Sequence, residues 1–131
     1  MVIDELPILY PSLVIFNVKS LVNLYAQVNY LGSAYFTRAL LPTLKRLYPK
    51  GVSKERGHLH GHLVFVSSMG GQLGVYGYSA YGASKFALRG FAEAIQMELA
   101  AHNVWVTLAH PADTATPGFD RENTCKAFTF Y

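Results

Sequence analysis

The sequence contains a single cysteine, Cys125, so no disulfide can form within the chain. One unpaired cysteine is typical of a protein kept in a reducing compartment. No run of about eighteen apolar residues occurs, and we therefore expect no segment that spans a bilayer. Charged residues make up only 15% of the 131 residues, against 51% hydrophobic ones. This balance predicts one globular domain at most rather than a disordered chain.

Basic residues give the chain a net charge of +3 and gather in two places, at Lys45-Arg46 and between Lys50 and Arg56. No stripe in which aromatic and basic residues alternate accompanies them, as it would in a nucleic-acid-binding surface. A solvated surface loop is the better interpretation of this charge. We expect no nucleic-acid partner.

Three histidines, His58, His60 and His62, alternate with other residues just before an apolar run. In an extended chain this spacing places three imidazoles on one side, an arrangement that can bind zinc. Neither a cysteine nor a carboxylate other than Glu55 stands nearby to complete such a site. A polar loop that leads into a strand is the better interpretation, and we expect no metal.

Two short apolar runs flank a helical stretch in the second half of the chain. The run around Val64 and the run over 104–109 are rich in β-branched residues, as buried parallel strands are. We predict a strand over 62–68, a helix from 79 or 80 to about 100, and a strand over 104–109. The fold class is therefore α/β with a parallel sheet. Ligands of such sheets bind beyond the carboxyl ends of the strands, where Ser68 and His110 are expected.

Residues 19 to about 48 also have a helical pattern, because six large side chains fall on one face. These six are Leu21, Leu24, Tyr25, Val28, Leu31 and Tyr35. Asn29 lies inside this helix although asparagine is a poor helix former. Either it is an exposed polar position, or it marks a local break that frees a carbonyl for a water or a lysine. Pro42 is expected to bend or end the helix.

The stretch from Ser67 to Lys85, SSMGGQLGVYGYSAYGASK, joins the predicted strand to the second helix. The glycines at positions 70, 71, 74 and 77 fit a loop that needs positive φ or close backbone approach. Tyr81 and Lys85 stand four apart, so both project from one face of a helix. A phenol held beside an ammonium can act as an acid, because the positive charge favours the phenolate.

This stretch resembles the signature of the short-chain dehydrogenase/reductase family, which is Tyr-x-x-x-Lys with a Ser thirteen residues before the Tyr. Ser68 stands thirteen residues before Tyr81, and Ala83-Ser84 precedes Lys85 as is usual in the family. The family also has a catalytic Asn, often in Asn-x-x-Gly, which Asn29 to Gly32 matches. The resemblance implies a partial Rossmann-like, doubly wound parallel sheet and four catalytic residues, Asn29, Ser68, Tyr81 and Lys85.

In the roles that the resemblance implies, Tyr81 donates a proton to a keto oxygen that Ser68 orients. Lys85 makes Tyr81 more acidic and hydrogen-bonds the nicotinamide ribose, while Asn29 holds a water that links Lys85 to solvent. A Pro-Gly-x-x-x-Thr segment of the family holds the nicotinamide carboxamide, and here Ala112 replaces its glycine. The cofactor-binding residues that we expect are Tyr81, Lys85, Pro111, Thr114 and Thr116.

Three phrases of the sequence are similar to one branch of this family: 71–74, 86–90 and 111–119. That branch reduces long-chain keto sphingoid bases with NADPH in sphingolipid synthesis, at the cytosolic face of the endoplasmic reticulum. The resemblance therefore implies a lipid substrate, NADPH and this location. Two alternatives remain, a reductase of a steroid or other lipid ketone, and a non-catalytic α/β remnant that associates with full-length subunits.

The sequence lacks the family's Thr-Gly-x-x-x-Gly-x-Gly turn, whose backbone amides bind the cofactor pyrophosphate. We therefore expect residues 19–123 to be a partial catalytic domain without its N-terminal dinucleotide-binding half. Residues 1–18 and 124–131 stay unassigned. By itself this fragment is expected to be inactive.

Small residues recur along the second helix at spacings of four, three and four positions. They are Ala83, Ala87, Gly90 and Ala94. Such a stripe lets another surface approach closely. It fits either a subunit interface or packing on the chain's own sheet, and a homo-oligomer that uses the helices of Leu21 and Tyr81 is one expectation.

Overall fold

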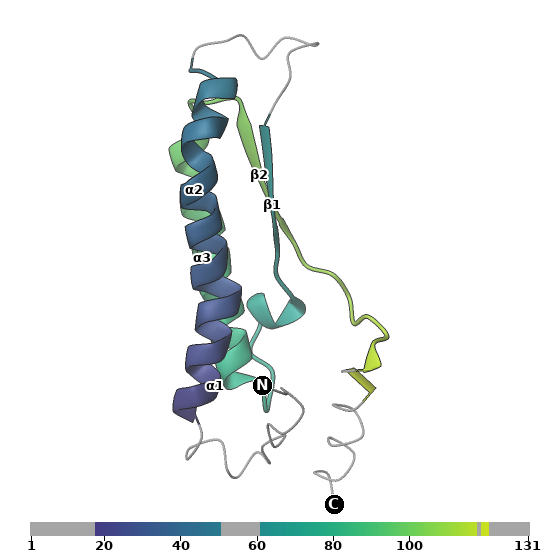
Figure 1. The fold of residues 1–131 in the computed structure, drawn as a ribbon. Helices are drawn as coiled ribbons and strands as arrows, with labels where there is room; N and C mark the ends of the chain where they lie inside the picture. Colours follow the sequence, from purple (N-terminus) through teal and green to yellow (C-terminus); the bar gives the residue numbers. More distant parts are fainter. Residues whose placement is uncertain (1–17, 51–60, 118, 121–131) are drawn as a thin grey trace, which may run out of the picture.

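The computed structural model describes residues 18–50, 61–117 and 119–120. Its elements follow one another as helix, strand, helix and strand, and the first helix contains a widened turn (Figure 1). The elements are α1 (Val18–Tyr25), the π-helical turn η3 (Ala26–Leu31), α2 (Gly32–Leu47), β1 (Gly61–Val66), the 3₁₀ turn η4 (Met69–Gly71), α3 (Ser79–Leu99) and β2 (Val104–Ala109).

The two strands form a parallel sheet in which Gly61 lies opposite Val104 and Val66 lies opposite Ala109. Helix α3 is the connection between them, as parallel strands require. The predicted α/β class with a parallel sheet is confirmed. The second strand has the predicted bounds, whereas the first begins and ends one or two residues earlier than the pattern indicated.

The hydrophobic core lies between the sheet and α3. Figure 1 shows α2 and α3 running alongside each other on the same side of the two strands. Each strand sends alternate side chains to this covered face. The buried apolar residues are Leu63, Phe65, Leu88, Ala92, Ile95, Leu99 and Val104, and the half-buried Leu40, Leu41 and Leu44 of α2 pack against them.

The opposite face of the sheet is apolar but exposed within the described residues. Val64 and Val66 of β1 are 57% and 59% exposed, and Trp105 of β2 is 52% exposed. On the same face, the His62 ring lies 2.6 Å from the Thr107 hydroxyl. Only one face of the two strands is therefore part of the described core.

A helix was predicted over 19–48. The structure has helical turns throughout 18–47, and the π-helical turn η3 divides them into α1 and α2. Pro42 was expected to bend or end this helix; it does not end it, because α2 continues past this residue to Leu47, and the bend stays a prediction. None of the helices in the described ranges is both long and apolar enough to cross a membrane.

Packing on the chain's own sheet is not found for three of the four small residues of α3, and the fourth, Ala94, is half-buried. Ala83, Ala87 and Gly90 are exposed, and a side chain built at Gly90 would meet nothing within 4 Å. The face toward the sheet is taken instead by a stripe of three large side chains, Leu88, Ile95 and Leu99, together with Ala92. The small residues lie outside the core.

Candidate active site

The carboxyl ends of both strands meet at one rim of the molecule, as parallel strands require. Ser67 continues the pairing by donating its N–H to the carbonyl oxygen of Ala109 at 2.8 Å. One residue further on, Nδ1 of His110 lies 2.8 Å from the carbonyl oxygen of Ser68. The sequence prediction that Ser68 and His110 share a rim is confirmed.

Ser68 begins the short turn η4. Its backbone is extended, with φ −162° and ψ 167°, and its hydroxyl accepts a hydrogen bond from the Gly70 N–H at 3.3 Å. This is the behaviour of a serine that caps the start of a helical turn. The turn carries the chain from the end of β1 back toward α3.

Two adjacent glycines let η4 pack closely against α3. A Cβ atom on Gly70 would lie 3.3 Å from Cε1 of Tyr81. A Cβ on Gly71 would overlap the hydroxyl of Ser67 and lie 3.1 Å from the carbonyl oxygen of Lys85. Here glycine is needed for close approach, whereas further along the loop Gly77 has a positive φ of 81°. The turn thereby brings the Ser68 segment against the first turns of α3.

Tyr81 lies in the first turn of α3 and is half-buried. Its ring packs edge-to-face on Tyr25 of α1, with 5.5 Å between ring centroids, and on Tyr78, with 6.1 Å. Such aromatic pairs stabilise a side chain beyond its burial alone. The phenol is therefore held from two sides.

Lys85 stands one turn after Tyr81 on the same face of α3, as their spacing predicts. Its ammonium nitrogen lies 5.6 Å from the centroid of the Tyr81 ring. The same nitrogen donates a hydrogen bond to the carbonyl oxygen of Val66, the last residue of β1, at 3.1 Å. Burial lowers the pKa of Lys85 below its ordinary value, because the charged form loses contact with water.

Asn29 lies inside the π-helical turn η3, which is a local break of the helix as one of the two alternatives predicted. The carbonyl oxygen of Asn29 accepts a hydrogen bond from the Ser33 hydroxyl at 2.9 Å. Among the described residues no hydrogen bond joins Lys85 to this carbonyl, and the Lys85 ammonium donates to Val66 instead. The Asn29 amide instead donates to the Ser84 hydroxyl at 3.0 Å, and that hydroxyl donates to the carbonyl oxygen of Tyr81 at 2.7 Å.

The segment from Pro111 to Thr116 is exposed and has no regular secondary structure. Within it, Thr114 donates its hydroxyl to the carbonyl oxygen of Ala112 at 3.2 Å. The hydroxyl of Thr116 accepts a hydrogen bond from the Phe119 N–H at 3.1 Å. The segment starts at the rim beside His110, and this is the position that the sequence indicated for a cofactor loop.

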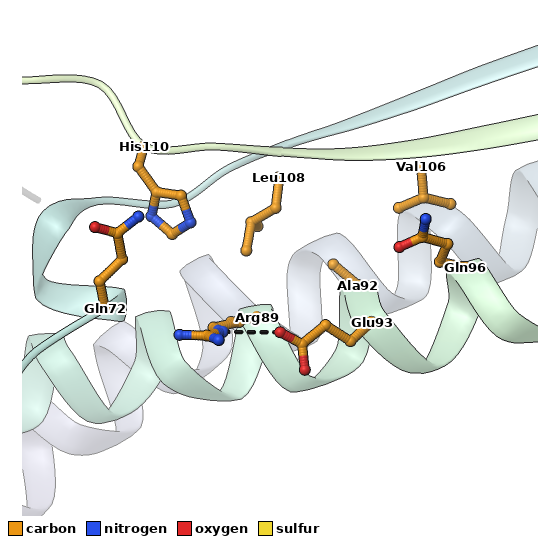
Figure 2. Close-up of a pocket in the computed structure, with 8 residues that line it drawn as sticks. All are labelled: Gln72, Arg89, Ala92, Glu93, Gln96, Val106, Leu108 and His110. Carbon is orange, nitrogen blue, oxygen red and sulfur yellow. Dashed lines mark hydrogen bonds and ion pairs between the residues drawn. The ribbon is translucent and has the colours of Figure 1, made fainter.

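A cavity of about 400 Å³ lies between α3 and β2 (Figure 2). Its polar wall includes an ion pair in which Nε of Arg89 lies 2.8 Å from a Glu93 carboxylate oxygen. Its residues are Gln72, Arg89, Ala92, Glu93, Gln96, Val106, Leu108 and His110. None of the four predicted catalytic residues lines this cavity, so it is a separate feature of the surface.

The structure contains contacts that the sequence interpretation missed. Ser84 links Asn29 to the backbone of Tyr81, and its place before Lys85 in the quoted motif was the available signal. No pattern in the sequence indicated that Tyr25 and Tyr78 pack on the Tyr81 ring. Among the described residues no cluster suited to a metal ion occurs, while His58 and His60 lie outside the described residues.

Comparison with known proteins gives consistent matches over most of the chain. The family model described as short chain dehydrogenase matches residues 16–126. The 3-ketodihydrosphingosine reductase of Bos taurus is 52% identical over 99 residues, covering 76% of this chain and 26% of that protein. The chain thus spans about a quarter of the length of the curated relatives that it matches.

Two solved structures share the fold. A short-chain dehydrogenase from Streptomyces avermitilis has a TM-score of 0.61 and 34% identity, covering 78% of this chain and 33% of that one. A short chain dehydrogenase from Burkholderia cenocepacia, solved in complex with NADP, also has a TM-score of 0.61, with 26% identity over 73% of this chain and 35% of that one. The motif, the geometry of the rim and these matches agree, and the chain belongs to the short-chain dehydrogenase family.

Proposed function

We propose that this chain forms the catalytic part of an NADPH-dependent reductase that converts 3-ketodihydrosphingosine to dihydrosphingosine. The observation that supports this most strongly is the 52% identity to a 3-ketodihydrosphingosine reductase. That identity extends over 99 of the 131 residues, a span that necessarily includes Tyr81 and the end of β1. Nothing in the fold or the comparisons favours the alternatives of a non-catalytic remnant or a steroid reductase.

The residues at the rim fit the nicotinamide end of such a cofactor. An ammonium that is only partly buried lies at the end of β1, beside the Tyr81 phenol. The exposed segment 111–116 starts at the same rim and carries two threonine hydroxyls. In this proposal Tyr81, Lys85, Pro111, Thr114 and Thr116 hold the nicotinamide and its ribose. When bound, NADPH supplies the hydride that reduces the keto carbon and leaves as NADP⁺.

The protein's own contribution is the proton and its placement. As the keto carbon is reduced, negative charge grows on the keto oxygen, and the Tyr81 hydroxyl donates its proton there to form the alcohol. The Ser68 hydroxyl donates a hydrogen bond to the same oxygen and orients it. The cation of Lys85 stabilises the phenolate that Tyr81 becomes. Acid catalysis of this kind typically contributes about 10²–10⁴-fold.

Asn29 contributes from the neighbouring helix. Its amide donates to Ser84, whose hydroxyl bonds to the backbone of Tyr81, so the widened turn and the start of α3 are tied together. In this proposal Asn29 also holds a water that returns a proton from solvent to Lys85 and Tyr81. Replacement of Asn29 would then slow proton supply and loosen the Tyr81 turn together.

The location and assembly of the protein belong to the same proposal. We place the enzyme at the cytosolic face of the endoplasmic reticulum, where a long-chain sphingoid base is available. Homo-oligomers would form through α1 and α3, whose outward side chains include Leu24 and Phe86, each 42% exposed. Taken alone, the 131 residues are expected to bind NADPH weakly, since the sequence has no Thr-Gly-x-x-x-Gly-x-Gly turn for the pyrophosphate.

The function is tested in a graft. In it, residues 19–123 of this chain replace the corresponding segment of the Bos taurus 3-ketodihydrosphingosine reductase. We expect NADPH oxidation with 3-ketodihydrosphingosine at a rate within about tenfold of the parent enzyme, with one alcohol formed per NADPH consumed. The 131-residue chain, assayed in parallel, is expected to show no turnover.

Two controls make the result specific. A steroid ketone and a medium-chain ketone are assayed at the same concentrations, and both are expected to react more slowly than the sphingoid base. A graft that folds and binds NADPH but reduces none of these ketones would contradict the proposed function. If the graft reduces the steroid ketone faster than the sphingoid base, the proposed substrate would be wrong, and the proposed ketone reduction would stand.

A further inference from the structure

His110 follows the last residue of β2, and its half-buried ring lies at the rim. The last backbone hydrogen bond between the two strand ends joins the Ser67 N–H to the Ala109 carbonyl oxygen. One residue further on, Nδ1 of His110 is 2.8 Å from the Ser68 carbonyl oxygen. The histidine side chain thus extends the pairing of the two strand ends by one residue, to Ser68.

The partner atom determines which ring nitrogen of His110 carries a hydrogen. A carbonyl oxygen only accepts hydrogen bonds, so Nδ1 of His110 is the donor. In the neutral ring this selects the tautomer with hydrogen on Nδ1 and leaves Nε2 as an acceptor. The charged ring carries a hydrogen on Nδ1 as well. His110 therefore offers a donor to Ser68 in either protonation state.

Ser68 receives hydrogen bonds from two directions. Its carbonyl oxygen accepts from the Gly71 N–H at 2.9 Å, within η4, and from His110 on the side of β2. A carbonyl oxygen has two lone pairs, so both bonds can form together. Among the described residues, the Ser68 hydroxyl has only the longer bond from the Gly70 N–H, at 3.3 Å. Its direction therefore depends mainly on how the Ser68 backbone is held.

We propose that His110 is a positioning residue that fixes the Ser68 backbone and thereby aims the Ser68 hydroxyl at the substrate oxygen. The proposal rests on the proposed function, in which that hydroxyl orients the keto group. His110 also lines the cavity between α3 and β2, but its proposed task, a hydrogen bond to Ser68, is a different one. Figure 2 shows the His110 ring and the Gln72 amide at the same end of that cavity. An apolar side chain could fill that wall but could not donate to Ser68.

Two substitutions of nearly equal shape separate these two tasks. In His110→Asn, the amide nitrogen is attached at the same position along the side chain as Nδ1 of histidine, so the donor is kept. In His110→Leu, a methyl group takes that place and the donor is lost. In the graft, we expect His110→Leu to lower kcat by about 10- to 100-fold, since misplacement near the chemistry by about 1 Å can cost about 10²-fold. The KM for NADPH should stay within about twofold, because the cofactor residues are untouched.

His110→Asn is expected to keep kcat within about threefold of the unmodified graft. Gln72→Ala serves as the control, because it alters the same end of the cavity without touching Ser68, and it should leave kcat within about twofold. Equal kcat values for the Asn and Leu variants would overturn the proposal. So would a loss in Gln72→Ala as large as that in His110→Leu.

A spectroscopic measurement is independent of activity. Long-range ¹H–¹⁵N correlation spectra of the 131-residue chain and of the graft report which ring nitrogen of His110 carries hydrogen. We expect Nδ1 to be protonated at neutral pH, and a neutral ring protonated on Nε2 would overturn the assignment. An unmodified graft without reductase activity would contradict the proposed function and not the role of His110. In that case the protonation of Nδ1 would still show whether His110 donates to Ser68.

Discussion

The two halves of α3 make different kinds of contact. In its first turns, Tyr81 and Lys85 are half-buried and contact an aromatic ring and a strand-end carbonyl oxygen. Further along, from Leu88 to Leu99, the buried side chains are apolar, and these two residues are only 2% and 0% exposed. The start of the helix thus carries the candidate site, and the rest of it carries most of the described core.

An energetic cost lies beside the polar start of α3, at the residue that follows β1. The hydroxyl of Ser67 is buried and has no hydrogen-bond partner among the described residues. An unsatisfied buried hydroxyl costs about 1–3 kcal/mol. It lies where Gly71 packs against Lys85. The difference teaches that the close packing around Tyr81 and Lys85 does not stabilise the fold as efficiently as the buried leucines further along α3.

The largest expected effect comes from removing the phenolic hydroxyl. In the graft, Tyr81→Phe should lower kcat by about 10²–10⁴-fold, because the proton donor is lost. The ring contacts with Tyr25 and Tyr78 remain, so the thermal midpoint should change by less than about 2 °C. Steady-state kinetics and a melting curve of the same sample measure both. Turnover close to that of the unmodified graft would remove Tyr81 from this role.

The opposite result is expected at the other end of the helix. Leu99→Ala should lower the free energy of unfolding by about 2–5 kcal/mol, since it removes a fully buried side chain and leaves a cavity. The kcat per folded molecule should stay within about twofold. Met97→Ala is the matched control on the same helix, because Met97 is 74% exposed, and its effect should be under about 0.5 kcal/mol. Similar losses in both variants would contradict the separation.

Gly71→Ala tests the close packing of η4 against the first turns of α3. The added methyl group would overlap the Ser67 hydroxyl and lie 3.1 Å from the Lys85 carbonyl oxygen, so η4 must move away from α3. We expect a loss of about 1–3 kcal/mol in the free energy of unfolding, together with a lower kcat. Gly74→Ala is the control, since a Cβ there meets nothing within 4 Å. An unchanged kcat in a destabilised Gly71→Ala would show that the packing serves stability alone.

The smallest effect concerns the protonation of Lys85. Burial lowers its pKa in the folded chain, so the unfolded chain binds more protons between that lowered pKa and the ordinary lysine value of about 10.4. In this window the contribution of Lys85 to stability rises with pH, and below it the charged form disfavours folding. Urea unfolding of the graft and of Lys85→Met at several alkaline pH values measures this. The difference between the two should shift in favour of the unmodified graft as pH rises, and a shift the other way would contradict the lowered pKa.

The sequence predicted the elements of α3 and β2 well because their periods are regular. It also predicted that Tyr81 and Lys85 share a face, which depends only on helix geometry. It could not predict that the Lys85 ammonium bonds to the Val66 carbonyl oxygen, or that Asn29 bonds to Ser84, which is 55 residues away. Such contacts depend on how elements pack, and no local pattern encodes them.

Two stripes along α3 illustrate the same limit. The small residues at 83, 87, 90 and 94 follow spacings of four, three and four, and so does a second stripe at 88, 92, 95 and 99, in which all but Ala92 are large. Spacing alone therefore cannot determine which stripe faces the sheet. Buried area does, because each leucine removes far more apolar surface from water than an alanine. The structure buries the stripe with Leu88 and Leu99 and leaves the other outside.

The widened turn at 26–31 also determines where this helix can change in length. An extra residue in a regular α-helix turns everything before it by about 100° about the axis. The π-helical turn absorbs such a residue locally, as the bond from the Gly32 N–H to the Gln27 carbonyl oxygen reflects. Tyr25 before the turn and Tyr30 within it therefore both reach α3, at Tyr81 and Phe91. A one-residue deletion inside the turn would leave both halves of the helix in phase, whereas the same deletion in the middle of α2 would swing Tyr25 away from Tyr81.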